Sequence, residues 1–185
     1  MMVRVAVCLL AVLAIFGSPA LAQEQSKADV FAGYSLFRYN PATSGVKSWN
    51  MNGGSGSFAY NAKNWLGLVG DFGGYHNGNI LSSGVSSNEY TYLFGPRISY
   101  RHYEKLTPFG QILFGGAHVT ASFAGTSTSD SAFAWGLGGG VDAKINTRFS
   151  VRLGQFDYLM TRFNEGAGGS SQNNLRFSTG VIIHF

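Results

Sequence analysis

The sequence has few of the residues that support several common kinds of protein chemistry. Of its 185 residues one is cysteine, Cys8, and only 12% are charged. A single thiol forms no disulfide within the chain and no zinc–thiolate site. The net charge is +4, and no run of Lys or Arg stands anywhere in the chain. These absences argue against a disulfide-stapled fold and give no case for a nucleic-acid partner.

What the chain has in quantity is glycine and aromatic residues. It contains 26 glycines, and 15% of its residues are Phe, Trp or Tyr. The glycines follow no triplet period, which excludes collagen, and so many aromatics argue against disorder. Glycine together with aromatic and β-branched residues is typical of an all-β protein.

The first residues have the pattern of an export signal. Arg4 precedes an apolar run at residues 5–16, and Ala20, Leu21 and Ala22 form a small-x-small cleavage site. The run is shorter than the roughly 20 residues that a membrane helix needs. We therefore expect residues 1–22 to be a cleaved signal peptide that takes Cys8 with it. The mature chain, residues 23–185, is then one domain.

The clearest strand pattern is NEYTYLFGPRISYR, residues 88–101. The even positions from Tyr90 to Tyr100 are apolar, whereas the odd positions from Glu89 to Arg101 are mostly small or charged. Alternate residues of a strand face opposite sides, so one face is apolar with tyrosines at both ends. Tyr and Trp favour the membrane–water boundary, and this pattern therefore predicts a membrane-spanning strand.

Similar alternation occurs in residues 65–75, 108–119, 131–145 and 174–185, and two further strands are expected near 30–39 and 49–60. Segment 150–163 breaks phase because Arg152 and Asp157 have opposite parity. Either a bulge near Gly154 corrects the phase, or Asp157 lies beyond the membrane edge. The aromatic residues expected at the membrane boundaries are Trp65, Tyr90, Tyr92, Tyr100 and Trp135.

The connections between these strands alternate in length. Residues 61–64, 101–107 and 145–148 are short turns, and the remaining connections, 40–48, 77–87, 120–130 and 164–174, are longer and rich in Gly, Ser and Asn. Short turns at one end and long loops at the other are typical of outer-membrane barrels. We therefore predict an eight-stranded antiparallel up-and-down transmembrane β-barrel. A soluble exported lipocalin-like barrel that carries an apolar ligand remains the alternative, because alternation alone does not tell which face is inside.

The chain ends on an aromatic residue. A spanning sheet must satisfy its backbone internally, so the last strand is expected to pair with the first. Its apolar face resembles the C-terminal sorting signal that the barrel-assembly machinery reads. The residues of that signal are Phe177, Val181, Ile183 and Phe185.

Several segments together resemble a known family: GYSLFRY, YNAKNWLGLVGDF, YLFGPRISYR, AFAWGLGGGVDAKI and LRFSTGVIIHF. They are similar to the small outer-membrane β-barrels, akin to the transmembrane domain of OmpA and to OmpX. The resemblance implies that the mature protein is embedded in the lipid of the outer membrane of a Gram-negative-type cell. That family includes porin-like and adhesive members, so an extracellular ligand of the long loops is a further expectation. Unlike in full-length OmpA, we expect no peptidoglycan-binding domain after the barrel.

An eight-stranded barrel has room inside mainly for its own side chains. Buried charges persist when they are paired, and we expect Asp71 to pair with Arg97 and Asp142 with Arg152. The predicted function is structural or surface-interacting, with a lumen plugged by polar side chains; the alternative is a narrow porin-like channel. The inward polar residues are predicted to be Asp71, Glu89, Arg97, Arg101, Gln111, Asp142, Lys144, Arg152 and Arg176.

Some small outer-membrane barrels modify lipid A, which requires a serine nucleophile, a histidine base and an acidic residue. Here His118 has Thr120 and Ser122 nearby, but the spacing matches no hydrolase motif. No cluster of His, Asp and Glu has the spacing of metal ligands. We therefore expect neither an enzyme nor a cofactor.

Overall fold

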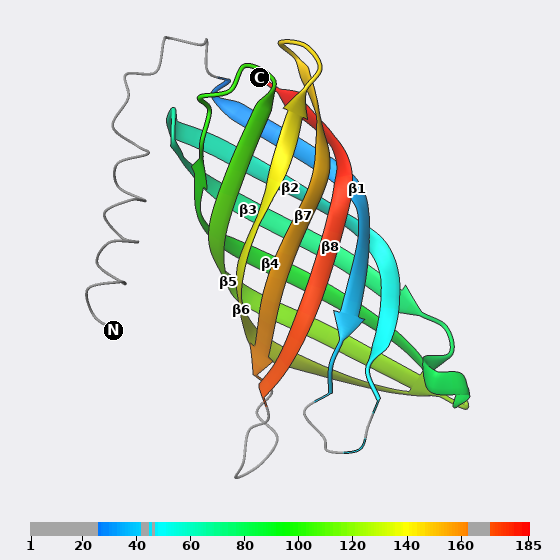
Figure 1. The fold of residues 1–185 in the computed structure, drawn as a ribbon. Helices are drawn as coiled ribbons and strands as arrows, with labels where there is room; N and C mark the ends of the chain where they lie inside the picture. Colours follow the sequence, from blue (N-terminus) through cyan, green and yellow to red (C-terminus); the bar gives the residue numbers. More distant parts are fainter. Residues whose placement is uncertain (1–25, 42–44, 46, 163–170) are drawn as a thin grey trace, which may run out of the picture.

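The computed structural model describes residues 26–41, 45, 47–162 and 171–185, so the predicted signal peptide lies outside the described residues. These residues form a closed eight-stranded barrel in which each strand is antiparallel to the next in chain order (Figure 1). Within the described residues, no helix is long and apolar enough to cross a membrane. The strands are β1 (Ala28–Tyr39), β2 (Trp49–Lys63), β3 (Leu66–Asn77), β4 (Ser86–Ser99), β5 (Leu106–Phe123), β6 (Thr126–Lys144), β7 (Phe149–Arg162) and β8 (Ser171–His184).

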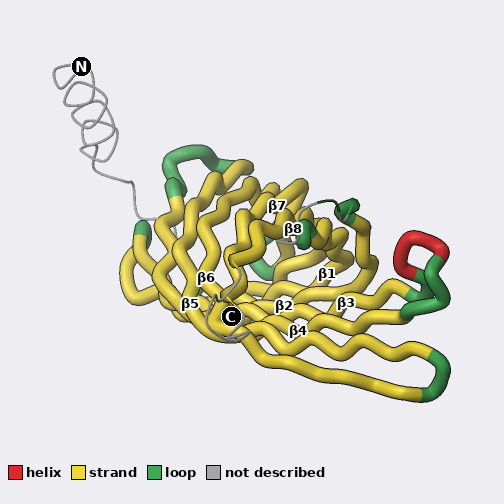
Figure 2. Tube along the Cα trace, turned by 90° about the horizontal axis from the view of Figure 1, so that it is seen from below, coloured by secondary structure: helices red, strands yellow, loops and turns green. Residues whose placement is uncertain are grey.

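The barrel closes where β1 pairs with β8, as the sequence predicts. Val30 stands opposite Ile183 in this pairing. Phe185 donates its backbone N–H to the carbonyl of Ala28 at 2.8 Å and accepts from the N–H of Lys27 at 2.8 Å. The end of the chain is therefore bonded to the beginning of the first strand, and no sheet edge is left along this pairing. Figure 2 shows the closed ring of strands in a view turned by 90°.

The apolar faces of the strands point outward, away from the barrel axis. Tyr92 and Phe94 are 44% and 53% exposed, whereas Leu93 between them is fully buried. Trp135 lies on the outer face of β6, with its ring centroid 6.4 Å from that of Tyr158 on β7. The predicted orientation of the aromatic faces is thus confirmed.

Strand β7 contains the predicted bulge. On its β6 side, Val141 pairs with Gly154 but the next residue, Asp142, pairs with Arg152. The pairing with β8 shifts at the same place, between Arg152 and Gln155. One extra residue on β7 reverses the parity, so Arg152 and Asp157 both point into the lumen. The alternative, with Asp157 beyond the membrane edge, is wrong.

One predicted loop is wrong. Residues 120–130, expected as a long connection, continue β5 and β6 as paired strands with Phe123 opposite Thr126. Ala124 and Gly125 alone join them, with φ angles of 48° and 82°. Two consecutive positive φ values are those of the type I′ turns that fit the twist of a hairpin. Residues 118–132 are here named the hairpin extension (Figure 1). Its β6 half lies beyond the pairing of β6 with β7, which begins at Phe133, whereas its β5 half stays paired with β4 as far as Ser122.

The other connections fall as predicted at the two ends of the barrel. Short turns join β2 to β3, β4 to β5 and β6 to β7, at the end where the C-terminus lies (Figure 1). At the opposite end, residues 78–85 join β3 to β4 and contain a 3₁₀ turn, Ile80–Ser82. Residues 171–174, predicted as part of a long connection, belong to β8. We call these the turn end and the loop end of the barrel.

Candidate functional site

Inside the barrel, six strands contribute polar side chains to a connected network, here named the charge layer. It contains three guanidinium groups and three carboxylates, so its formal charge is balanced. Most of its members are nearly or fully inaccessible to solvent. The members are Asp71, Arg97, Gln111, Asp142, Arg152, Gln155, Asp157 and Arg176.

Asp157 is the central acceptor of the charge layer. Its Oδ1 accepts from Gln111 Nε2 at 3.1 Å, and its Oδ2 accepts from Gln155 Nε2 at 2.7 Å. Arg176 Nε also donates to Oδ2, at 2.9 Å. Arg176 in turn reaches Asp71 through Nη1 at 2.6 Å. One carboxylate therefore connects side chains from β5, β7 and β8, and through Arg176 from β3.

The predicted pair Asp142–Arg152 is present. Arg152 Nε and Nη2 donate to the two carboxylate oxygens of Asp142 at 2.8 and 3.1 Å, in a bidentate arrangement. Arg152 Nη1 donates to Gln155 at 2.6 Å, which joins this pair to Asp157. The guanidinium also lies 4.3 Å from the ring centroid of Phe31 and 4.5 Å from that of Phe109.

The predicted pair Asp71–Arg97 is wrong. Arg97 donates to Gln111 Oε1 through Nε and Nη2 at 3.0 and 2.8 Å, whereas Asp71 binds Arg176. In the β3–β4 register Asp71 stands opposite Leu93, and Arg97 stands opposite Gly67. Arg97 is thus four residues closer to the turn end, and the partner of Asp71 comes from β8, across the lumen.

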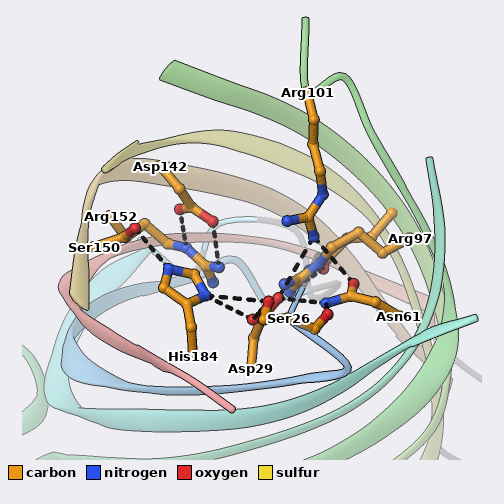
Figure 3. A network of polar contacts seen from close by, with 10 residues as sticks. Ser26, Asp29, Asn61, Arg97, Arg101, Asp142, Ser150, Arg152 and His184 are labelled. Carbon is orange, nitrogen blue, oxygen red and sulfur yellow. Dashed lines mark hydrogen bonds and ion pairs between the residues drawn. The ribbon is translucent and has the colours of Figure 1, made fainter. Parts of the chain in front are cut away.

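A second polar cluster lies at the turn end of the lumen, near the opening (Figure 3). The His184 ring is hydrogen-bonded to Asp29 through Nδ1 at 2.6 Å and to Ser150 through Nε2 at 2.7 Å. Arg101 lies 3.5 Å from Asp29 and donates to Asn61 Oδ1 at 3.1 Å. These contacts join the first and last strands to their neighbours. The predicted inward residues did not include Asp29 or His184, although strand parity places His184 on the same face of β8 as Arg176.

Toward the loop end the lumen contains a cluster of large apolar side chains, which the sequence analysis did not predict. Phe37 stacks on Tyr75 with ring centroids 4.7 Å apart, and Met51 and Leu159 are buried beside them. Tyr39 stacks on a partly buried tryptophan, Trp49, at 4.5 Å. Tyr75 also accepts from Arg176 at 3.2 Å, so this group touches the charge layer. We name it the aromatic layer: Phe37, Tyr39, Met51, Tyr75 and Leu159.

The two other inward predictions, Glu89 and Lys144, lie outside these clusters. Glu89 is fully buried opposite Tyr75, and in the described part of the chain no group donates a hydrogen bond to its carboxylate. Lys144 is half-buried at the turn end, opposite Ser150.

The aromatic residues predicted at the membrane boundaries lie on the outer surface, and their position at those boundaries stays a prediction. Trp65, Tyr90 and Tyr92 are exposed, and Tyr100 and Trp135 are partly covered. Of the predicted sorting residues, Val181 and Phe185 are exposed on the same face of β8, where Phe177 and Ile183 are half-buried.

No catalytic or metal centre is evident in the described residues. His118 is hydrogen-bonded through Nδ1 to Ser131 Oγ at 2.9 Å, a contact between β5 and β6 that the sequence did not suggest. No carboxylate of the described residues bonds to this histidine, so the pair lacks the acid that would orient a base. Ser122 instead contacts Ser127 at 2.8 Å. Among residues 26–41, 47–162 and 171–185, no group of three potential ligands could hold a metal ion.

Comparisons with known proteins agree with this architecture. Residues 8–185 match the family model described as the outer membrane protein beta-barrel domain. The fold is similar to that of Ail of Yersinia pestis, with a TM-score of 0.62 and 19% identity over 87% of this chain and 99% of that one. Neisserial surface protein A has a TM-score of 0.67 and 14% identity over 88% of this chain and 100% of that one. No curated protein matches the sequence.

Removing the central acceptor should destabilise the barrel strongly. In Asp157→Ala, Arg176, Gln111 and Gln155 lose a shared acceptor in a space closed to water. We expect a loss of about 3–5 kcal/mol in the free energy of unfolding. Urea titration in lipid vesicles, followed by tryptophan fluorescence, measures it.

The matched control is Asp130→Ala in the hairpin extension, where the carboxylate is exposed. This change should alter the free energy of unfolding by about 0.5 kcal/mol or less. Equal effects of the two substitutions would contradict a central role for Asp157.

Proposed function

The chain belongs to the outer membrane protein beta-barrel family, and on that premise we propose that it serves in the outer membrane as a closed, non-conducting barrel. Its role is then structural, and the part outside the membrane is available for contact with other molecules. Catalysis has no part in the proposal, because the His118–Ser131 pair has no acidic partner in the described residues.

The observation that supports a closed lumen is the burial of the side chains that line it. Arg152 and Arg176 are each 1% exposed, and Phe37, Met51 and Leu93 are fully buried. Side chains that line a water-filled pore would contact that water and would be exposed to it. The interior of an eight-stranded barrel is just wide enough for side chains to fill, and these side chains fill it.

The lumen is blocked by two different layers, one after the other. The charge layer lies toward the turn end, and the aromatic layer lies toward the loop end. An ion that passed the aromatic layer would still meet Arg176, which is held by Asp71 and Asp157. The alternative, a narrow porin-like channel, therefore requires both layers to open together.

This arrangement predicts how conductance responds to substitution. The parent protein should give no current steps in a planar lipid bilayer. Neither Phe37→Ala with Met51→Ala nor Asp71→Ala with Arg176→Ala should open it, because the other layer remains in each case. The protein with all four substitutions should give resolved current steps.

Folding of every variant is checked by the shift in electrophoretic mobility on boiling in SDS. Current through the folded parent protein would contradict the proposal and favour the porin-like channel. Current through either folded double variant would contradict two independent barriers.

The hairpin extension is the feature that supports contact outside the cell. Among the described residues, Thr126–Ala132 of β6 pair with β5 only, since pairing with β7 begins at Phe133. An unpaired strand edge is a template for another strand. Ail has been solved with the heparin analogue sucrose octasulfate, but Asp130 is the one charged residue in the extension, which does not suit a polyanion. We infer that the unpaired edge of β6 binds a strand of another molecule. A second copy of this protein on a neighbouring cell can supply that strand.

Lysines on this edge should therefore prevent cell–cell contact. Cells that display the parent barrel should clump and settle, and Ser127→Lys with Ser129→Lys should slow settling to the rate of cells without the barrel, because like charges on paired strands repel. The matched control places the same two charges on the inner strand, as Thr120→Lys with Ser122→Lys, and should settle like the parent. Equal settling of all displaying cells would contradict the edge as the contact surface.

The C-terminal residues are proposed as the sorting signal for the assembly machinery. The Phe185 side chain is 70% exposed, while its backbone is bonded to Lys27 and Ala28. An exposed side chain of this kind is accessible to a binding partner.

Phe185→Ala should lower the amount of assembled barrel in cells. Phe133→Ala, which removes another exposed outer-face Phe, should not. Both changes should cost similar stability in vesicles, about 1–3 kcal/mol. Assembly is measured as the heat-modifiable fraction of the protein in outer membranes. Equal assembly of the two variants would reject Phe185 as part of the signal.

A further inference from the structure

The outer wall of the barrel contains a groove of about 480 Å³. This volume lies within the range of roughly 300–1,000 Å³ that is common for sites of small ligands. The groove crosses the wall formed by β6, β7, β8, β1 and the start of β2, where β7, β8 and β1 lie side by side (Figure 1). Its walls are formed by side chains of these strands, among them Leu36, Arg38, Tyr158 and Phe177.

Strand register explains why a groove exists on an outer wall. One row of outward side chains runs through neighbouring register pairs: Leu137 with Tyr158, Tyr158 with Leu175, and Leu175 with Arg38. A second row, nearer the turn end, is formed by Phe156, Phe177 and Leu36.

Between the two rows lie Asp157 and Arg176, which also border the groove. Their side chains point into the lumen and are buried there, so the wall between the rows presents backbone to the outside. The result is an apolar channel, open to lipid, between two rows of large side chains.

One end of the groove carries a positive charge. Arg38 is the penultimate residue of β1, at the loop end, and stands opposite Asn50 on β2. Its Nη2 donates to Ser48 Oγ at 2.9 Å. No carboxylate of the described residues forms a salt bridge with it. A guanidinium on a lipid-facing wall is costly unless an anion compensates it, and it has donors left to bind one.

We propose that this groove binds a phosphorylated glycolipid of the outer leaflet, of the lipid A type. One acyl chain lies between the two rows of apolar side chains, and a phosphate accepts hydrogen bonds from Arg38. Arg38 lies at the loop end of the barrel, which places its charge in the outer leaflet. Glycolipids of this type reside in that leaflet. Because the groove is outside the barrel, this inference does not depend on the lumen being closed.

Binding is tested with the full barrel, refolded in detergent and titrated with diphosphorylated lipid A, with the bound fraction read by native mass spectrometry. We expect one tightly bound lipid per barrel. Arg38→Gln should weaken binding about tenfold, as expected for loss of a hydrogen bond to a charged group. Arg38→Lys should retain most of the affinity. Leu36→Trp, which fills the groove with an outward side chain, should weaken binding without loss of charge.

The matched control is Arg162→Gln. Arg162 is also exposed near the loop end of a strand, on β7, but it does not border the groove. This change should leave the affinity unchanged, and folding of each variant is checked by its mobility shift on boiling in SDS. Equal weakening by Arg38→Gln and Arg162→Gln would mean attraction to net charge alone and would overturn the proposal.

The lipid itself is varied in a second arm. Dephosphorylated lipid A should bind the parent protein about tenfold more weakly, for the same reason as Arg38→Gln. Phosphatidylglycerol should also bind more weakly than lipid A. Equal affinity for phosphatidylglycerol would assign the groove to a phospholipid and overturn the glycolipid proposal, and equal affinity for the dephosphorylated lipid would remove the role of Arg38.

Discussion

In a bilayer no water is available to bond an unpaired backbone group, and this constraint determines the rest of the structure. It requires the last strand to pair with the first, which the Phe185–Ala28 hydrogen bond completes at the turn end. Closure with eight strands sets the diameter, and the diameter leaves an interior that side chains fill. Alternation then assigns every second residue to lipid and every other one to a narrow space. The lumen therefore has to be packed like a protein core, although much of it is polar.

A polar core of this kind is stable only if its charges are compensated. Three guanidiniums and three carboxylates meet in the charge layer, and Asp157 accepts from residues on three strands. Arg176 extends the connection to Asp71 on the opposite wall and to Tyr75 in the aromatic layer. Contacts across the lumen thus supplement the hydrogen bonds between neighbouring strands. In the closed barrel that we propose, the same contacts also close the lumen, because the groups that hold the walls together occupy the space through which an ion would pass.

Features that depend on one strand or one pair of neighbours were predictable from sequence. The alternation of apolar and polar residues predicted eight strands, and the opposite parity of Arg152 and Asp157 predicted the bulge beside Gly154. The adjacency of their strands predicted the pair Asp142–Arg152. The partner of Asp71 was not predictable, because it lies across the lumen on β8 and depends on how the strands are staggered. The aromatic layer was missed because β1 carries aromatic residues on both faces, with Phe31, Phe37 and Tyr39 buried and Tyr34 exposed, so alternation does not separate them. The hairpin extension was taken for a loop because alternating Ser and Thr give no apolar contrast.

Arginine side chains on both faces of the barrel wall need a compensating negative charge, but the source of that charge differs between the two faces. In the lumen, Arg176 meets two carboxylates of the same chain. On the lipid side, Arg38 donates to the neutral hydroxyl of Ser48. A charge in a poorly polar environment needs an opposite charge close by, and on the lipid face the surrounding membrane is the source of anions. The position of Arg38 at the loop end of an apolar groove follows this logic: the barrel supplies the cation, and the outer leaflet supplies the phosphate and the chain.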